Sequence, residues 1–165
     1  MRIAILTVSD AGARGERADR SGDAIAAWAA AHGHSVVVRA IVADETALIV
    51  PWLLRRCDDD EADLVLTTGG TGLSPRDVTP EATRAVIERE APGIAERLRG
   101  SAAARFPKSA LARGVAGVRA RALIVNLPGS PSGVSDYLDA LAPIVEHAVA
   151  IVRGDVTEHD AKGPA

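Results

Sequence analysis

The sequence predicts an α/β fold, a three-layer α/β/α sandwich in which a mostly parallel sheet lies between two layers of helices. Short apolar runs, typical of strands that are buried on both faces, alternate along the chain with longer stretches of helical character. Such alternation indicates βαβ units, in which successive strands run parallel. Each predicted strand is also followed by polar or glycine-rich residues.

The composition indicates an ordinary globular protein. Of the 165 residues, 47% are hydrophobic and 25% are charged, so we expect one domain over residues 1–154 and a flexible polar tail over residues 155–165. The net charge of −3 provides no basic excess for binding nucleic acid or an anionic membrane. The single Cys57 excludes a disulfide framework. Because no apolar run is long enough for a signal peptide or a membrane span, we expect a cytoplasmic protein.

The first half of the chain is predicted to contain three buried strands separated by two helices. The strands are expected at residues 3–8, 36–42 and 64–67, and the helices at residues 22–32 and 46–57, with a polar loop over residues 9–20. Asp19 or Ser21 is the expected N-cap of the first helix, and Gly33 ends it. Pro51 removes a backbone hydrogen bond from the second helix, so we expect a kink or a late start there.

The second half is predicted to contain three helices and two short strands. The helices are expected at residues 80–90, 93–99 and 132–152, and the strands at residues 115–118 and 122–125. Thr79 is the expected N-cap of the first of these helices, because Pro80 and Glu81 suit its first turn.

The polar and glycine-rich segments after four of the predicted strands contain the candidates for a binding site. The carboxyl ends of parallel strands meet at one edge of a sheet, and ligands bind just outside that edge. The candidates there are Ser9, Asp10, Asp44, Thr68, Gly69, Gly70, Thr71, Gly72, Arg76, Asp77, Asn126, Pro128, Gly129 and Ser130.

The turn from Thr68 to Gly72 is the sharpest feature of the sequence. Closely spaced glycines permit positive φ angles, and their N–H groups can form a nest that binds a phosphate. No Gly-Lys-Ser/Thr sequence follows, and the turn is not Gly-x-Gly-x-x-Gly, so neither a Walker loop nor a dinucleotide fingerprint is present. The alternative is a tight connection that binds no ligand.

Asp44 and Asp77 are candidate ligands for a magnesium ion. Each follows a predicted strand closely, and Mg²⁺ is commonly bound by one or two carboxylates together with substrate phosphates. The alternatives are that Asp44 caps a helix and that Asp77 forms an Asx-turn. Arg76 could pair with a phosphate or could be a solvated surface charge.

These residues resemble the signature of the molybdenum-cofactor biosynthesis family, in particular the molybdopterin adenylyltransferases of MogA/MoaB type, which are related to the gephyrin G domain. The resemblance rests on residues 66–72 (Leu-Thr-Thr-Gly-Gly-Thr-Gly) and residues 75–83 (Pro-Arg-Asp-Val-Thr-Pro-Glu-Ala-Thr). Residues 8–10, 42–45 and 123–131 also fit the family pattern. The resemblance therefore extends over about residues 2–154.

The resemblance implies that the protein transfers AMP from ATP to the terminal phosphate of molybdopterin and releases pyrophosphate. It implies a homotrimer that passes its product to a molybdate-insertion enzyme. The two essential aspartates of the family correspond to Asp44 and Asp77, its glycine motif to Gly69–Gly72, and its Pro-Gly-Ser loop to Gly129 and Ser130.

Two other functions remain open at this point. The same fold occurs in CinA-type proteins, where it is linked to nucleotide pyrophosphatase chemistry, and such a protein would hydrolyse ATP without a pterin. A non-catalytic trimer that binds molybdopterin or scaffolds partners would bind the pterin without releasing pyrophosphate.

Overall fold

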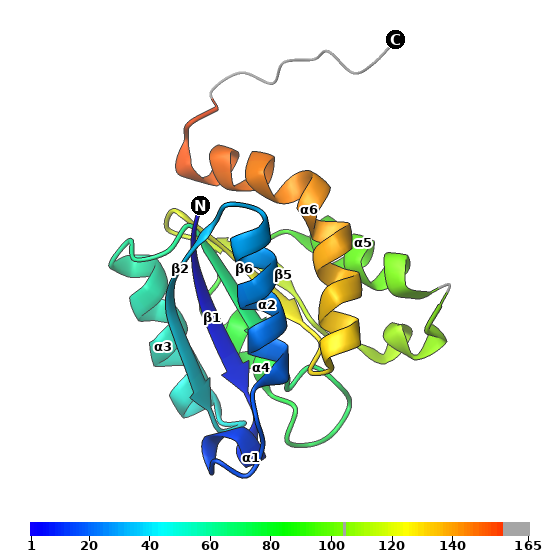
Figure 1. Ribbon diagram of the computed structural model, residues 1–165. Helices are drawn as coiled ribbons and strands as arrows, with labels where there is room; N and C mark the ends of the chain where they lie inside the picture. Colours follow the sequence, from blue (N-terminus) through cyan, green and yellow to red (C-terminus); the bar gives the residue numbers. More distant parts are fainter. Residues whose placement is uncertain (104, 157–165) are drawn as a thin grey trace.

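A six-stranded sheet forms the middle layer of the molecule (Figure 1), and the computed structural model describes residues 1–103 and 105–156. Most of the expected tail, residues 157–165, lies outside the described residues. The strands are β1 (Arg2–Val8), β2 (Ser35–Val42), β3 (Leu64–Thr68), β4 (Arg89–Glu90), β5 (Ala116–Arg119) and β6 (Ala122–Leu127), in the spatial order β2-β1-β3-β6-β5-β4. The first four in that order run parallel, whereas β5 and β4 are antiparallel to their neighbours.

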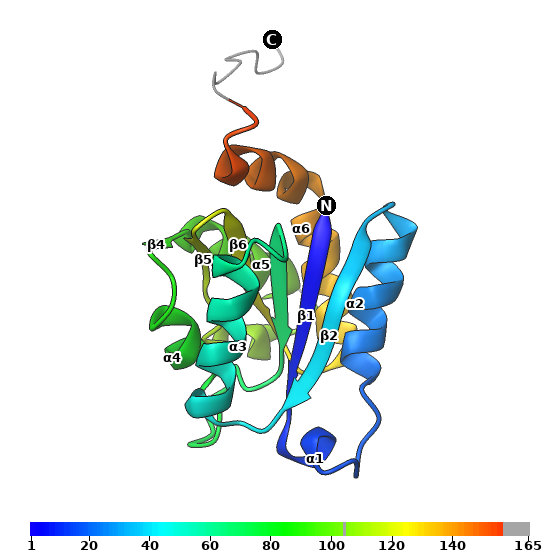
Figure 2. The same ribbon diagram turned by 90° about the vertical axis from the view of Figure 1, so that its left-hand side faces the viewer.

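Helices cover both faces of the sheet, which confirms the predicted three-layer sandwich. The helices are α1 (Asp10–Ala13), α2 (Arg20–Ala31), α3 (Thr46–Asp58), α4 (Thr79–Arg84), α5 (Pro92–Ala103) and α6 (Pro131–Arg153), and η1 (Pro107–Leu111) is a 3₁₀ helix. Figures 1 and 2 show α2 and α6 on one face, and α3 and α4 on the other. In the described part of the chain, no helix is both long and apolar enough to cross a membrane.

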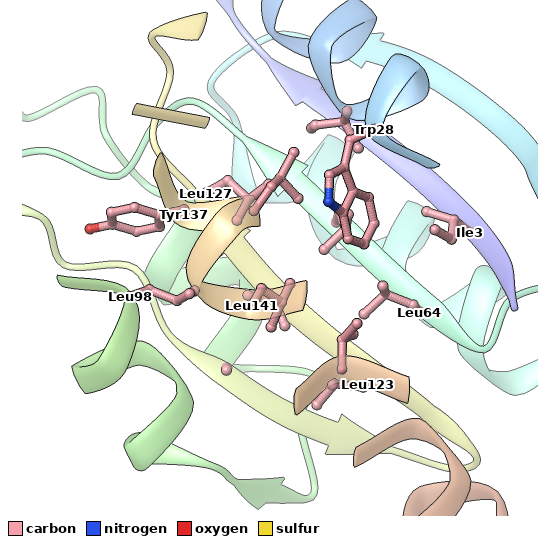
Figure 3. Close-up of a cluster of buried hydrophobic side chains, with 14 of the residues drawn as sticks. Ile3, Trp28, Leu64, Leu98, Leu123, Leu127, Tyr137 and Leu141 are labelled. Atoms are coloured by element: carbon pink, nitrogen blue, oxygen red, sulfur yellow. The ribbon is translucent and has the colours of Figure 1, made fainter. Parts of the chain in front are cut away.

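Each face of the sheet has its own apolar core. Figure 3 shows the larger core, in which Ile3, Leu64 and Leu123 of the sheet meet Trp28 of α2 and Leu141 of α6. The second core joins the other face to α3 and α4 and contains buried side chains of both helices. The parallel strands β1 and β3 are thus buried on both faces, as their apolar sequences predict.

The structure corrects several predicted element boundaries. Helix α3 begins at Thr46 although Pro51 lies inside it, so the alternative of a late start is wrong. Asp19 is the N-cap of α2, and its carboxylate accepts a hydrogen bond from Gly22 N. Thr79 is not the N-cap of α4, because that position is Val78 and the Thr79 hydroxyl donates to the Gly69 carbonyl. The short α1 lies within the segment that was predicted to be a loop.

The predicted helix over residues 80–90 is also wrong beyond its first turns. Helix α4 ends at Arg84, and the chain then pairs with the outer edge of β5 through Glu88 N to Val118 O at 2.8 Å and Ala91 N to Ala116 O at 2.8 Å. The two-residue strand β4 is too short to leave an alternating pattern in the sequence.

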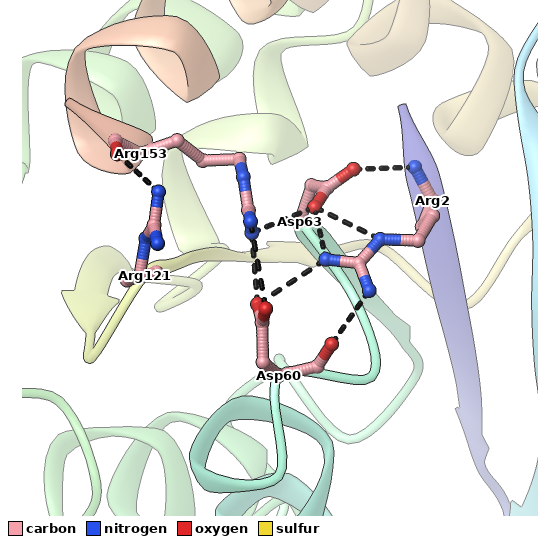
Figure 4. Close-up of polar contacts among 5 residues, drawn as sticks. All are labelled: Arg2, Asp60, Asp63, Arg121 and Arg153. Atoms are coloured by element: carbon pink, nitrogen blue, oxygen red, sulfur yellow. Dashed lines mark hydrogen bonds and ion pairs between the residues drawn. The ribbon is translucent and has the colours of Figure 1, made fainter. Parts of the chain in front are cut away.

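An ionic cluster closes the amino end of the sheet, opposite the carboxyl ends of the parallel strands (Figure 4). Asp63 accepts hydrogen bonds from Arg2 N at 2.7 Å and from the Arg2 guanidinium at 2.7 Å, and Arg153 of α6 lies 2.8 Å from the same carboxylate. Arg153 also contacts Asp60 at 2.8 Å, and Arg121 donates to the Arg153 carbonyl at 2.6 Å. The cluster therefore attaches the end of α6 to the starts of β1 and β3.

Acid is expected to weaken this attachment. The Arg153 guanidinium lowers the pKa of Asp60 from its ordinary value to about 2, and hydrogen bonds from Arg2 lower the pKa of Asp63 although burial opposes them. A lowered pKa stabilises the fold above the unfolded-state pKa near 3.8, and that contribution is lost as the pH falls toward 2. Urea unfolding at pH 5 and pH 2.5 should show a smaller loss of stability for the double variant Asp60→Asn/Asp63→Asn than for the wild type.

Asp59→Asn provides the control for this measurement. Asp59 is an exposed neighbour that pairs with Arg55 and takes no part in the cluster, so its variant should lose as much stability on acidification as the wild type. Equal losses for the wild type and the double variant would show that the cluster does not determine the acid sensitivity.

Candidate active site

The register of the sheet brings the predicted site residues to one edge. Val8 of β1 pairs with Val42 of β2, Thr7 pairs with Thr68 of β3, and Thr68 pairs with Leu127 of β6. These four parallel strands therefore end at nearly the same level. The segments that follow them lie at the edge toward which β1 and β2 point, near α1 at the bottom of Figure 1.

The glycine turn after β3 has the predicted positive φ angles, 94° at Gly69 and 61° at Gly70. A Cβ atom on Gly69 would lie 2.2 Å from the Val8 carbonyl oxygen. A Cβ on Gly70 would lie 2.4 Å from the Thr79 hydroxyl and 2.9 Å from Asp44 Oδ1. Both the backbone conformation and the close packing therefore require glycine at these two positions.

Asp44 and Asp10 hold each other through a reciprocal pair of hydrogen bonds. Asp10 N donates to Asp44 Oδ2 at 2.9 Å, and Asp44 N donates to Asp10 Oδ1 at 3.1 Å. Arg76 contacts both carboxylate oxygens of Asp10, at 2.8 and 3.1 Å. The N-cap of α3 is Glu45, so the alternative that Asp44 caps this helix is wrong.

Asp44 lies in an environment that disfavours its negative charge. Burial raises its pKa, and the charges of Asp10 and Asp77 raise it further, against the hydrogen bond from Asp10 N and the charge of Arg76. The two candidate catalytic carboxylates therefore lie near enough to interact electrostatically. A positive charge bound between them would relieve that repulsion.

Asp77 lies on the loop that follows the glycine turn. Its Oδ2 accepts a hydrogen bond from Ser74 N at 2.8 Å, and a Cβ on Gly72 would lie 2.9 Å from the same oxygen. The alternative of an Asx-turn is wrong, because in that turn the side chain accepts from the N–H two residues further on, whereas Asp77 accepts from the N–H three residues before it.

Arg113 holds this loop in place and was not among the predicted site residues. Its guanidinium donates to the Gly72 carbonyl at 2.7 Å and to the Asp77 carbonyl at 2.5 Å, and it also pairs with Glu81. Its backbone N–H donates to Thr71 O at 2.9 Å. Because Arg113 is far from the loop in the sequence, no local pattern indicates this contact.

Two cavities meet at the glycine turn. The first has a volume of about 770 Å³ and contains Asp44, and the second has a volume of about 630 Å³ and contains Asp77. Gly70, Gly129 and Ser130 line both cavities. These three residues therefore form a rim that separates the two spaces.

Most of the predicted site residues line these cavities. The first is lined by Ser9, Asp44, Thr68, Gly69, Gly70, Gly129 and Ser130, and the second by Gly70, Thr71, Gly72, Asp77, Pro128, Gly129 and Ser130. Asp10 and Arg76 line neither cavity. Asp10 forms hydrogen bonds with Asp44, and Arg76 pairs with Asp10.

Asn126 is buried within the sheet, so its prediction as a ligand contact is wrong. Its side chain is 2% exposed, and its amide donates to the hydroxyls of Thr67 and Thr83 at 2.9 Å each. Its side-chain oxygen accepts from Val115 N at 3.1 Å. These contacts use the hydrogen-bonding capacity of the amide to join β6 to its neighbours.

The loop after β6 is fixed by contacts to other elements. The Thr68 hydroxyl donates to the Pro128 carbonyl at 2.7 Å, and the Ser21 hydroxyl donates to the Gly129 carbonyl at 2.8 Å. Ser130 is the N-cap of α6 and accepts from Gly133 N at 3.2 Å. Hydrogen bonds to β3 and α2 therefore hold the part of the rim that follows β6.

Comparisons with known proteins agree on one family. Residues 4–147 match the family described as probable molybdopterin binding domain. The chain is 37% identical to the molybdopterin adenylyltransferase of Helicobacter pylori J99, over 98% of this chain and 93% of that protein. The molybdopterin adenylyltransferase of Escherichia coli K12 is also 37% identical, over 90% and 80% of the two chains. The crystal structure of the molybdopterin biosynthesis enzyme MoaB from Thermus thermophilus is similar with a TM-score of 0.88 and 49% identity, over 93% of this chain and 96% of that one.

Proposed function

This chain belongs to the molybdopterin-binding domain family, and from that premise we propose that it is a molybdopterin adenylyltransferase. It would transfer AMP from ATP to the terminal phosphate of molybdopterin and release pyrophosphate. The observation that carries the proposal is that relatives of this name match 98% and 90% of the chain.

The two cavities suit a reaction between two phosphate-bearing substrates. An oxygen of the molybdopterin phosphate forms a bond to the α-phosphorus of ATP, and the bond from that phosphorus to the pyrophosphate oxygen breaks. One substrate in each cavity would bring its reacting group to the shared rim of Gly70, Gly129 and Ser130. Such positioning converts a bimolecular encounter into a step within one complex, which can account for a large part of the rate enhancement.

Asp44 and Asp77 would hold a magnesium ion at this rim. In residues 1–103 and 105–156, no group of three or more His, Cys, Asp and Glu side chains is arranged to bind a metal by itself. Two carboxylates nevertheless fit Mg²⁺, which commonly takes one or two of them and completes its coordination with water and substrate phosphates. Burial, with the charges of Asp10 and Asp77, raises the pKa of Asp44, and a bound cation would offset this penalty on its negative charge. When bound, the ion would neutralise charge on the reacting phosphates.

The surrounding side chains would bind and orient the anionic substrates. Arg17 and Arg20 line the first cavity, and Lys108 lines the second, so each cavity has a cation for a phosphate group. Arg76 and Asp10 fix the carboxylate of Asp44, whereas Arg113 fixes the loop that bears Asp77.

Pyrophosphate release is the direct test of this function. Purified protein with ATP and Mg²⁺ should release pyrophosphate only when molybdopterin is present, and the release should stop when the metal is chelated. Hydrolysis of ATP without the pterin would favour a CinA-type pyrophosphatase instead. Pterin binding without any pyrophosphate release would favour a non-catalytic binding protein.

We also propose that the chain forms a homotrimer and passes its product to a molybdate-insertion enzyme, as the family resemblance implies. Light scattering coupled to size exclusion at micromolar concentration should give three times the chain mass of 17.1 kDa. A uniform monomer under these conditions would contradict the trimer.

A further inference from the structure

We propose that Phe106 stacks on the flat heterocyclic ring of the substrate that occupies the second cavity. The proposal rests on the proposed function and deepens it, because it names a recognition residue for one of the two substrates. Phe106 lies between α5 and η1 and lines the second cavity. Its side chain is 55% exposed.

The exposure of this ring is unusual for this chain. Only four residues are aromatic, and in the described residues Trp28 and Tyr137 are buried while Trp52 is half-buried. An exposed phenyl ring gains no stability from facing water, and because Phe106 lines a cavity, a flat ligand bound there could cover its ring.

The backbone holds Phe106 in place although its ring faces the cavity. Phe106 N donates to the Ala102 carbonyl at 2.8 Å, and Ser109 N donates to the Phe106 carbonyl at 2.9 Å. Pro107 follows directly and restricts the backbone of Phe106, whose φ and ψ are −140° and 86°. The ring is therefore presented from a fixed point, which reduces the entropy lost when a ligand stacks on it.

The neighbours of Phe106 indicate the chemistry of the ligand. Leu111, 53% exposed, adds a second apolar surface to the same cavity, and Tyr137 of α6 lines it as well. Lys108 contributes an ammonium group, and Asp77 lines the cavity as well. An aromatic and aliphatic wall beside a cation fits a flat ring that carries a phosphate. Both the adenine of ATP and the pterin of molybdopterin match that description.

The experiment measures the binding of each substrate separately by the full-length protein. Isothermal titrations with ATP and with molybdopterin compare the wild type with Phe106→Ala and Phe106→Tyr. Loss of one stacked ring is typically worth on the order of tenfold in affinity, so Phe106→Ala should raise the Kd of one substrate by about that factor. Phe106→Tyr should restore it, and the Kd of the other substrate should stay unchanged. The substrate whose Kd rises in Phe106→Ala is the one whose ring occupies the second cavity.

Ile151→Ala is the matched control. Ile151 is an exposed apolar residue near the end of α6, 42% accessible, that lines neither cavity, so its variant should bind both substrates as the wild type does. The melting temperatures of all variants should agree closely, because Phe106 is mostly exposed and its ring adds little to the core.

The outcomes separate this inference from the proposed function. If the wild type binds both substrates and Phe106→Ala binds them equally well, the stacking role is overturned while the adenylyltransferase stands. If the wild type binds neither substrate, both proposals fail. In turnover, a stacking contact predicts a raised KM for the same substrate with kcat nearly unchanged.

Discussion

Asp44→Ala and Asp77→Ala are each expected to lower the rate of pyrophosphate release at least about a hundredfold while the protein remains folded. Charge stabilisation by a metal and its ligands is worth several kcal/mol, and about 2.7 kcal/mol corresponds to a hundredfold. The structural cost is smaller. Asp44→Ala removes one acceptor from Asp10 N, a loss of about 1 kcal/mol. The comparison of pyrophosphate release with the thermal midpoint of each variant separates the two effects.

Asparagine variants distinguish metal binding from substrate orientation. Asparagine keeps an oxygen that can accept from Asp10 N or Ser74 N but removes the charge. If Asp77 binds Mg²⁺ directly, Asp77→Asn should raise the Mg²⁺ concentration needed for half-maximal rate, and excess Mg²⁺ should partly restore turnover. If Asp44 mainly orients a substrate, Asp44→Asn should lower turnover at every Mg²⁺ concentration.

Asp23→Ala is the control for this series. Asp23 is an exposed carboxylate on α2 that pairs with Arg39 and lines neither cavity, so its variant should react at the wild-type rate. Wild-type rates in Asp44→Ala and Asp77→Ala would refute a mechanism that depends on the two carboxylates.

The edge of the sheet that holds the site could be predicted because local patterns determine it. The apolar runs of β1 and β3 predict strands that are buried on both faces, and parallel strands place the residues after them together. The Gly69–Gly70 turn was predictable for a similar reason, since closely spaced glycines indicate positive φ angles whatever surrounds them.

The remaining features depend on contacts between residues that are distant in the sequence. Arg113 reaches the loop of Asp77 only because η1 and β5 bring it there. Asn126 follows the same strand-end pattern as the other candidate site residues, but its amide donates to hydroxyls on β3 and α4 and is buried in the sheet. The division of the edge into two cavities likewise results from α5, η1 and α6 on one side and α1 and α2 on the other. No local sequence pattern contains these arrangements.

Gly70→Val is expected to abolish the binding of both substrates and to destabilise the fold as well. The sequence alone predicts that this substitution lowers substrate affinity more than it lowers the stability of the fold. In the structure, however, the new side chain collides with residues that matter for both. The new Cβ would meet the Thr79 hydroxyl at 2.4 Å, and that hydroxyl donates to the Gly69 carbonyl at 2.9 Å. Overpacking together with a β-branched residue at a φ of 61° should cost about 3 kcal/mol in the free energy of unfolding. Because Gly70 lines both cavities, relaxation around it would displace Asp44 and the shared rim.

Gly33→Val separates the conformational cost from the collision. Gly33 has a φ of 71°, but a Cβ at this position would have no atom within 4 Å, and the residue lies at the end of α2, away from both cavities. Its variant should lose only the cost of the left-handed conformation, about 1–2 kcal/mol, and should bind both substrates normally. Urea unfolding gives the stability of each variant, and titration calorimetry gives its affinities. If Gly70→Val were no less stable than Gly33→Val and still bound ATP, the backbone at Gly70 would not need its close approach to Thr79 and Asp44, and the rim would have to lie elsewhere.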